Sequence, residues 1–354
     1  MTTLLQVTTS AEGGGIQTLV GQIADAAAER GWRSVVAYYR GSAPANSKAE
    51  YVRLPAGGRI RTWPFHFAVL ARRLKPDVVH VHGVTPGSIG AAAARAAGFR
   101  RIVYTDHFVH SLRPSGYRHL RRAAASLPMV NIAVCDAVSR SLIADAGIPP
   151  SRVVVIRNGT AEAAPLARPD DHRPRLAYVA NLWPWKGHGT LLRAISLLGG
   201  DPPARIVLIG DGPERTRIEG EITRLGIDDS VVLTGRAEDP WAHMDGAWAY
   251  VHPSSGEGLP LAVMEAMMRG LPVVAASSAG IPEIVEHERT GLLVPSGDPA
   301  ALALALRRIL ADRALRDQLA QSAREFAMSN LRIEDCLDAH FRLYERVSSR
   351  AAMR

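Results

Sequence analysis

The chain has 354 residues, 47% of them apolar, and a formal net charge of +8. This length predicts two domains rather than a single core, and no apolar run is long enough to span a membrane. Two cysteines, Cys135 and Cys336, exclude a framework of several disulfides and a cysteine-rich metal site. The N-terminus leads directly into a strand-like segment without the pattern of an export signal, so we expect a cytoplasmic protein.

The positive charge is concentrated in the first half of the chain. Residues 1–160 contain 20 Lys and Arg but only 8 Asp and Glu, and the remaining residues are acidic overall. We therefore expect the first half to meet an anionic partner, such as a membrane surface or a phosphorylated acceptor. Nucleic acid is not expected, because no recognised nucleic-acid-binding module accompanies the charge.

The first half alternates strands and helices. Strands are predicted near 4–9, 33–39, 77–82, 101–105, 130–134 and 152–156, and helices near 16–30, 63–74, 86–97, 117–125 and 137–146. This alternation predicts a parallel sheet with helices on both faces, which binds ligands at the carboxyl ends of its strands. The first strand ends in a glycine-rich turn, residues 13–15, that permits close approach of a ligand but matches neither the dinucleotide fingerprint nor a P-loop.

Three histidines lie at or just after strand ends of this half. His80 and His82 share one face of a strand, a geometry compatible with metal ligation. The sequence supplies no matching further ligands, so we interpret the two as a structural pair. His107 follows the next strand and is a candidate site residue.

A basic amphipathic stretch, residues 117–123, follows. Together with the upstream residues Arg59, Arg61, Trp63, Phe65 and Phe67, it combines cations with aromatic side chains. This combination is typical of a surface that contacts anionic lipid head groups. A solvated basic surface is the alternative.

The second half repeats the alternation after a linker. Residues 161–174 lack periodicity and are taken as that linker. Strands are predicted near 175–180, 204–209, 231–234, 248–252, 272–276 and 291–294, with helices near 188–198, 214–225 and 281–286 and from 299 almost to the end. We therefore expect two doubly wound domains, residues 1–160 and 175–329.

The block of residues 251–275 reads as strand, glycine-rich turn, helix, stop and strand. Pro260 suits the helix start, and Gly270 suits its end. Glu257 precedes the helix, and Glu265 lies inside an otherwise apolar helix. A helix N-terminus favours anions, so an anionic ligand is one interpretation. The other is that Glu257 compensates the helix dipole and that Glu265 is an exposed helix residue.

These motifs occur together, in this order, in a known family. The chain resembles the GT-B glycosyltransferases of the large retaining family 4, also called group 1. The resemblance rests on the first glycine turn, residues 77–82, His107, Asn158-Gly159, Lys186-Gly187, residues 210–213, the Glu257/Glu265 pair and residues 280–285. The two glutamates separated by seven residues are its specific signal.

The resemblance implies two Rossmann-like doubly wound domains that face a central cleft. The N-terminal domain would bind the acceptor, the C-terminal domain the nucleotide-sugar donor, and a final helix at 330–348 would cross back to the first domain. It implies a hexosyltransferase that retains anomeric configuration and needs no metal and no cofactor, with a UDP- or GDP-linked sugar as substrate. The acceptor would be glycan, lipid-linked or phosphorylated, in surface polysaccharide or glycolipid synthesis at the inner face of the cell membrane.

The resemblance also assigns residues. His107, Lys186 and Glu257 are the catalytic candidates, Lys186 at the diphosphate and the other two at the donor sugar. The ribose hydroxyls would bind Glu265. The remaining donor-binding candidates are Gly14, Gly15, Asn181, Arg236, Gly258, Leu259, Pro260 and Leu261.

The chain departs from the family pattern in places. Asn181 stands where many members carry an arginine, which weakens charge compensation at the diphosphate, and Thr160 replaces a frequent acidic residue. Two other functions remain open: a GT-B nucleotide-sugar epimerase, and a non-catalytic nucleotide-sugar-binding subunit.

Overall fold

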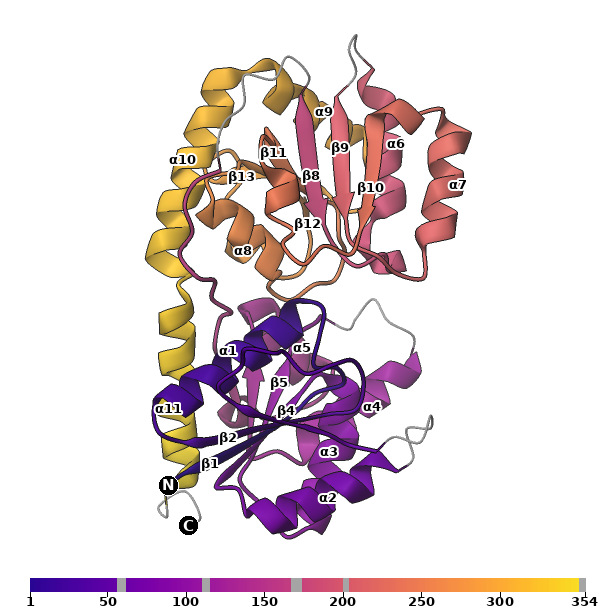
Figure 1. The fold of residues 1–354 in the computed structure, drawn as a ribbon. Coiled ribbons are helices and arrows are strands. Elements are labelled where there is room, and N and C mark those ends of the chain that lie inside the picture. The colour runs from indigo at the N-terminus through magenta and orange to yellow at the C-terminus, as the bar shows by residue number, and fades with distance from the viewer. Residues whose placement is uncertain (56–61, 110–114, 167–173, 200–203, 350–354) are drawn as a thin grey trace. The chain divides into compact units, whose positions relative to one another are not determined.

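The computed structural model describes residues 1–55, 62–109, 115–166, 174–199 and 204–349. The chain divides into unit 1, Met1–Asn158 with Glu334–Arg354, and unit 2, Gly159–Ile333. Each unit is a parallel sheet with helices on both faces (Figure 1), which confirms the predicted pair of Rossmann-like doubly wound domains. The predicted linker at 161–174 falls partly outside the described residues, because 167–173 are not among them.

The sheet of unit 1 has the strand order β3-β2-β1-β4-β5-β6-β7. Its strands are β1 (Thr3–Val7), β2 (Arg33–Tyr38), β3 (Glu50–Arg53), β4 (Val78–His82), β5 (Ile102–Asp106), β6 (Val130–Ala133) and β7 (Val153–Val155). The central strands β1, β4 and β5 are buried along their whole length, as expected for a parallel sheet covered on both faces. Sequence analysis missed β3, a four-residue edge strand that is only partly buried.

The helices of unit 1 are α1 (Gly15–Glu29), α2 (Trp63–Leu74), α3 (Val84–Ala96), α4 (Ser115–Ser126), α5 (Asp136–Ala144) and α11 (Ile333–Ser348). Helices α3 and α11 pack on opposite faces of β4. On one face, a Cβ on Gly90 of α3 would lie 3.4 Å from Val81. The side chain of the adjacent His80 points to the other face, and there it forms a hydrogen bond with Tyr344 OH of α11. The C-terminal helix therefore belongs to the fold of unit 1.

The sheet of unit 2 has the order β10-β9-β8-β11-β12-β13. Its strands are β8 (Arg175–Val179), β9 (Arg205–Ile209), β10 (Val231–Gly235), β11 (Ala249–His252), β12 (Val273–Ser277) and β13 (Gly291–Pro295). Its helices are α6 (His188–Leu198), α7 (Arg215–Leu225), α8 (Leu261–Met268), α9 (Pro299–Ala311) and α10 (Arg313–Asn330). The helix predicted near 281–286 is wrong: a single 3-10 turn, Ile281–Glu283, occupies it. The chain turns again at Glu286, which hydrogen-bonds through its N–H and its O to Thr290 directly before β13, and this ends the helical segment.

Each sheet has one place where the strand order reverses. In unit 1 it lies between β1 and β4, and in unit 2 between β8 and β11. Doubly wound sheets bind ligands outside the carboxyl ends of the two strands that flank this reversal. The loops after β8 and β11 are therefore the first place to look for a site in unit 2, and they carry Lys186 and Glu257.

Two segments at the ends of unit 2 run side by side. Thr160 N–H donates to Leu331 O at 2.8 Å, and Ile333 N–H donates to Thr160 O at 3.0 Å. A Cβ on Gly159 would lie 2.4 Å from Arg332 O, so only glycine permits this approach. The backbone hydrogen bonds thus fix the start of unit 2 against the residues that enter α11.

Candidate active site

The loop that carries Lys186 packs closely against the loop after β11, and a glycine allows this contact. β8 ends at Val179, and Lys186 closes a 3-10 turn before α6. Gly187 has φ 73°, and a Cβ there would lie 2.3 Å from Pro253 O. Glycine is therefore required both by the backbone conformation and by the close approach of the loop after β11.

Hydrogen bonds join the same two loops. Ser255 N–H donates to Trp185 O at 3.0 Å, and Ser254 Oγ lies 3.2 Å from the same oxygen. Tyr178 OH, from β8, donates to Lys186 O at 2.7 Å. The loops at the reversal point of unit 2 thus form one connected structure, and Lys186 and Glu257 are brought together by it.

Lys186 and Glu257 form an ion pair. Lys186 Nζ lies 2.6 Å from Glu257 Oε1, and the side chains are 17% and 9% exposed. Ser254 Oγ donates to the same carboxylate oxygen at 2.5 Å, and His252 Nε2 lies 3.5 Å from it. Burial raises the pKa of Glu257, but Lys186 and then His252 outweigh it and hold the pKa well below its usual range. Glu257 is therefore an anion throughout the neutral range.

Glu265 lies in an opposite electrostatic setting. It sits on α8, half-buried, and no hydrogen bond or ion pair joins its carboxyl to a described residue. Burial raises its pKa to about 7, and Arg269 opposes this only in part. The two glutamates thus differ in charge state at neutral pH. A partly buried carboxyl without a partner is a ready acceptor for ligand hydroxyls.

The other predicted donor-binding residues of unit 2 lie at strand or helix ends. Gly258, Leu259 and Pro260 lead into α8, which begins at Leu261, where the first backbone N–H groups have no intrahelical partner. The backbone N–H of Gly256 donates to Ser278 Oγ at 2.9 Å, which fixes the turn before them. Exposed Asn181 follows β8, and exposed Arg236 follows β10.

The predicted residues of the first half belong to unit 1. Gly14 precedes α1 with φ 94°, and Gly15 is the first residue of that helix. His107 follows β5 and is 6% exposed, and its Nε2 has no hydrogen-bond partner among the described residues. The structure therefore places Gly14, Gly15 and His107 at carboxyl ends of the unit 1 sheet, and the other candidates at those of the unit 2 sheet.

Four histidines of unit 1, His80, His82, His107 and His340, form a buried cluster. The rings of His80 and His82 are 3.8 Å apart, those of His82 and His107 5.8 Å, and those of His80 and His340 6.0 Å. His80 uses both ring nitrogens, toward Tyr344 OH and Thr105 Oγ1. That contact pattern agrees with the structural interpretation of the pair. Burial lowers all four pKa values, those of His107 and His340 to about 4.

Sequence reasoning missed the two side chains that support Glu257. His252 is the last residue of β11, and Ser254 lies three residues before the carboxylate; both are buried. The available signal was their position, since polar side chains at the carboxyl end of a strand beside a reversal point are expected to face a site.

The predicted lipid-facing stretch needs correction. Arg121 is 1% exposed and pairs with Asp106 at 2.6 Å, so it stabilises the interior of unit 1. Trp63 and Phe67 are fully buried, whereas Phe65 is 69% exposed. A helix turns its residues through every direction, so only part of the stretch reaches the surface: Phe65 of α2, and Arg118, Leu120 and Arg122 of α4. Arg59 and Arg61 lie outside the described residues.

Two family models match the chain. Residues 163–326 match the model for glycosyl transferases group 1, and residues 13–163 match the model for glycosyltransferase family 4. The two matches meet at residue 163 and together run from residue 13 to residue 326.

Curated relatives include two bacterial enzymes. The chain is 32% identical over 200 residues to the lipopolysaccharide core biosynthesis glycosyltransferase LpsD of Rhizobium meliloti, a match covering 55% of this chain and 57% of the relative. It is 27% identical over 268 residues to the UDP-Gal:alpha-D-GlcNAc-diphosphoundecaprenol alpha-1,3-galactosyltransferase of Escherichia coli, covering 70% and 69%. The match thus spans little more than half the length of the first of these relatives.

Solved structures share the whole fold. HepE of Anabaena in complex with UDP-glucose has a TM-score of 0.86 at 21% identity, covering 98% of this chain and all of that one. Sucrose-phosphate synthase of Thermosynechococcus elongatus has a TM-score of 0.87 at 23% identity, covering 98% and 99%. Within the described ranges, no helix combines the length and apolar character needed to cross a membrane.

Proposed function

Because this chain belongs to the group 1 glycosyltransferases of GT-B architecture, we propose that it transfers a hexose-type sugar from a UDP- or GDP-linked donor, with retention, to a glycan, lipid-linked or phosphorylated acceptor. The observation that carries the proposal is the Lys186–Glu257 ion pair at the reversal point of the unit 2 sheet, with the unpartnered Glu265 on the helix that follows.

The chemistry requires charge stabilisation at the leaving group. When the C1–O bond of the donor breaks, negative charge develops on the diphosphate, and preorganised donors and cations at that position lower the barrier. Lys186 and the free backbone N–H groups at the start of α8 supply such groups. No metal ion and no cofactor enter this scheme.

The anionic Glu257 serves the donor sugar. Its carboxylate would accept hydrogen bonds from sugar hydroxyls and stabilise positive charge at C1 as the bond breaks. The acceptor oxygen would bond to C1 on the face that the diphosphate leaves, and the acceptor proton would pass to a diphosphate oxygen. Glu265 would accept hydrogen bonds from the ribose hydroxyls.

The names of the relatives favour surface polysaccharide or glycolipid synthesis as the setting. One acts in lipopolysaccharide core biosynthesis, and another transfers galactose to a diphosphoundecaprenol-linked sugar. The basic first half, together with exposed Phe65 and Leu120, supports peripheral attachment to an anionic membrane surface.

The test is a turnover screen. The purified full chain is incubated with a panel of UDP- and GDP-sugars and candidate acceptors, and products are identified by mass spectrometry. We expect one donor to yield a nucleoside diphosphate and a glycosylated acceptor, and Lys186→Ala and Glu257→Ala to reduce the rate at least about 100-fold. The control is Arg313→Ala, which removes an 83% exposed cation at the start of α10 and should leave the rate unchanged.

Other results would reject the proposal. Isomerised nucleotide sugar formed without acceptor would identify an epimerase. Tight donor binding without turnover on any acceptor would identify a binding subunit. Full activity in both site variants would show that the chemistry lies elsewhere.

A further inference from the structure

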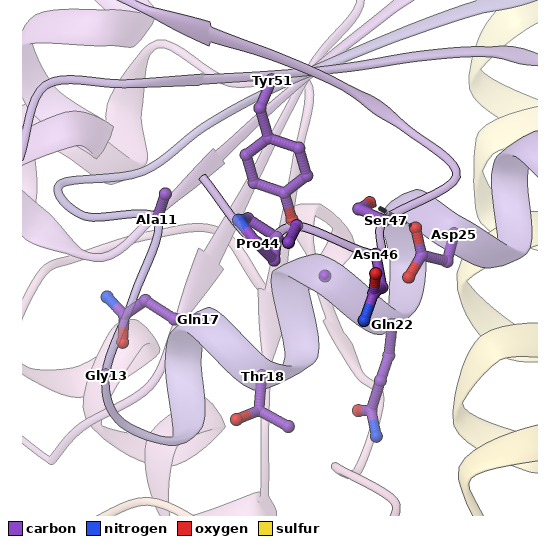
Figure 2. Close-up of a pocket in the computed structure, with 12 residues that line it drawn as sticks. Ala11, Gly13, Gln17, Thr18, Gln22, Asp25, Pro44, Asn46, Ser47 and Tyr51 are labelled. Carbon is purple, nitrogen blue, oxygen red and sulfur yellow. Dashed lines mark hydrogen bonds between the residues drawn. The ribbon is translucent and has the colours of Figure 1, made fainter. Parts of the chain in front are cut away.

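Unit 1 contains an open pocket outside the residues assigned so far. It has a volume of about 450 Å³, within the range of about 300–1,000 Å³ of small-molecule sites. Three segments line it: the turn after β1, one side of α1, and residues 44–47 with Tyr51 before and on β3 (Figure 2). The missed edge strand β3 thus forms part of its wall.

The pocket has no cationic lining. None of its 12 lining residues is Lys or Arg, and Asp25 is its one carboxylate. This contrasts with the strongly basic composition of residues 1–160. The adjacent Lys48 directs its ammonium to Glu29, at 2.5 Å. An anionic ligand would therefore meet a carboxylate without a compensating charge.

Three carboxamides line the pocket without partners. Gln17 and Gln22 stand on α1, and Asn46 lies on the facing loop. No hydrogen bond joins any of the three side-chain amides to a described residue, and Gln22 Oε1 is buried in that state. Each amide can donate and accept, which matches a ligand whose hydroxyls do the same.

Hydrogen bonds between α1 and the facing loop already order part of the lining. Ser47 Oγ and Lys48 N–H donate to Asp25 Oδ1 at 2.5 and 2.8 Å. Burial, with a contribution from Asp25, raises the pKa of Tyr51, so its hydroxyl remains a donor. In Figure 2, Gln17, Thr18, Gln22 and Asp25 lie along α1, and Ser47 and Tyr51 come from the facing segments. The pocket thus presents a fixed carboxylate and an aromatic side chain.

We propose that this pocket binds a neutral, hydroxyl-bearing sugar ring, and that the ring belongs to the acceptor. The second clause rests on the proposed function, whereas the first does not. Unpartnered amides, one carboxylate and a tyrosine provide donors and acceptors for several hydroxyls, and the absence of a lining cation disfavours a phosphorylated group at this position.

Gly21 provides a variant that changes the pocket without harming the fold. It lies inside α1, and a Cβ there would lie 3.5 Å from Tyr51 OH, an ordinary contact. Alanine favours a helix interior over glycine, so Gly21→Ala should not lower the melting temperature while its methyl occupies the pocket. Gly220→Ala in α7 is the matched control, because a Cβ there contacts nothing within 4 Å. Gln17→Ala removes one unpartnered amide.

The experiment measures binding of methyl glycosides of glucose, galactose, mannose and N-acetylglucosamine to the full chain by NMR titration, with glucose 6-phosphate as the anionic probe. We expect at least one neutral glycoside to bind in the millimolar range, and more tightly than glucose 6-phosphate. Gly21→Ala and Gln17→Ala should each weaken it about three- to tenfold, and Gly220→Ala should not. Binding of no neutral glycoside, tighter binding of the phosphate, or unchanged affinity in both pocket variants would overturn the proposal.

The two proposals fail separately. If the turnover screen succeeds but the pocket variants keep the KM for the acceptor, the acceptor assignment is wrong and the transferase stands. If neutral glycosides bind in the pocket but no donor is turned over, the sugar site stands and the transferase is wrong.

Discussion

Lys186 Nζ lies 2.6 Å from Glu257 Oε1, and the two groups neutralise each other. The residues proposed for opposite ends of the same bond, leaving group and donor sugar, are thus in direct contact. A diphosphate that binds Lys186 must share the ammonium with Glu257 or replace it. Ser254 Oγ also donates to the carboxylate, at 2.5 Å, and orients it.

Removal of the cation alone should destabilise unit 2. Lys186→Ala leaves the buried Glu257 carboxylate without its main partner, and we expect the free energy of unfolding to fall by about 2–4 kcal/mol. Lys186→Ala combined with Glu257→Gln should lose less, because the buried charge is gone. Denaturant unfolding followed by tryptophan fluorescence measures this, since Trp183 and Trp185 lie beside the site. Equal losses of unfolding free energy in both variants would contradict the negative charge assigned to Glu257.

Nucleotide affinity should rise with pH through Glu265. Its pKa of about 7 leaves the carboxyl partly protonated at neutral pH, and the ionised form accepts hydrogen bonds more strongly. Affinity for UDP or GDP, measured by calorimetry, should therefore increase from pH 6 to pH 8. The phosphate groups of the nucleotide titrate in the same range, and their contribution to the pH dependence of affinity is subtracted first. Glu265→Gln should weaken nucleotide binding and remove the pH dependence that is left.

Ionisation of Glu265 should lower the free energy of unfolding. Because its pKa is raised by folding, the folded state binds more protons than the unfolded state between about pH 4.5 and 7, so stability falls as pH rises through that window. At pH 8, Glu265→Gln should raise the free energy of unfolding by about 1–3 kcal/mol. A less stable variant would show that the carboxylate has a structural partner.

Unit 1 should lose stability in mild acid. Folding lowers the pKa values of His80, His82, His107 and His340, so their contribution is complete above about pH 6.5, where the unfolded chain is also neutral. It is lost as pH falls from 6.5 toward 4, because the unfolded state then binds more protons. His107→Gln should reduce the slope of stability against pH by about one proton. An unchanged slope would exclude His107 from the cluster's titration.

Membrane attachment should depend on both charge and Phe65. Co-sedimentation with phosphatidylglycerol-containing vesicles should exceed that with phosphatidylcholine alone and should weaken with added salt. Phe65→Ser should reduce it several-fold, because the exposed ring can insert at the interface. Leu304→Ser, at a 59% exposed leucine of unit 2, is the control. Equal binding to both vesicle types would remove the electrostatic account.

Local sequence rules predicted most of the fold. The apolar runs of β1, β4 and β5 and the helix boundaries of α1 and α2 follow from periodicity and from stop residues such as Gly31. Asp298, directly before Pro299, caps α9 by accepting from Ala300 and Ala301 N–H, which is a helix start that local sequence encodes. The sequence predicted Glu257 before the start of a helix and Glu265 inside that helix, and the structure has both in these positions.

Features that depend on contacts between residues far apart in the sequence could not be predicted. β3 is short and half-exposed, so it has no apolar pattern and exists only by pairing with β2. Arg121 reads as a surface cation because its partner, Asp106, lies on another element. The pairing of Lys186 with Glu257 and the contact of Tyr344 with His80 join residues 71 and 264 positions apart. No local pattern encodes such distances.

The most direct test is a crystal structure of the full chain with the nucleoside diphosphate or nucleotide sugar that binds best in calorimetry. The account predicts a diphosphate oxygen within hydrogen-bond distance of Lys186 Nζ, both ribose hydroxyls on the Glu265 carboxylate, and the phosphates at the start of α8. A nucleotide bound elsewhere, with Lys186 still paired to Glu257 and Glu265 without a partner, would contradict it.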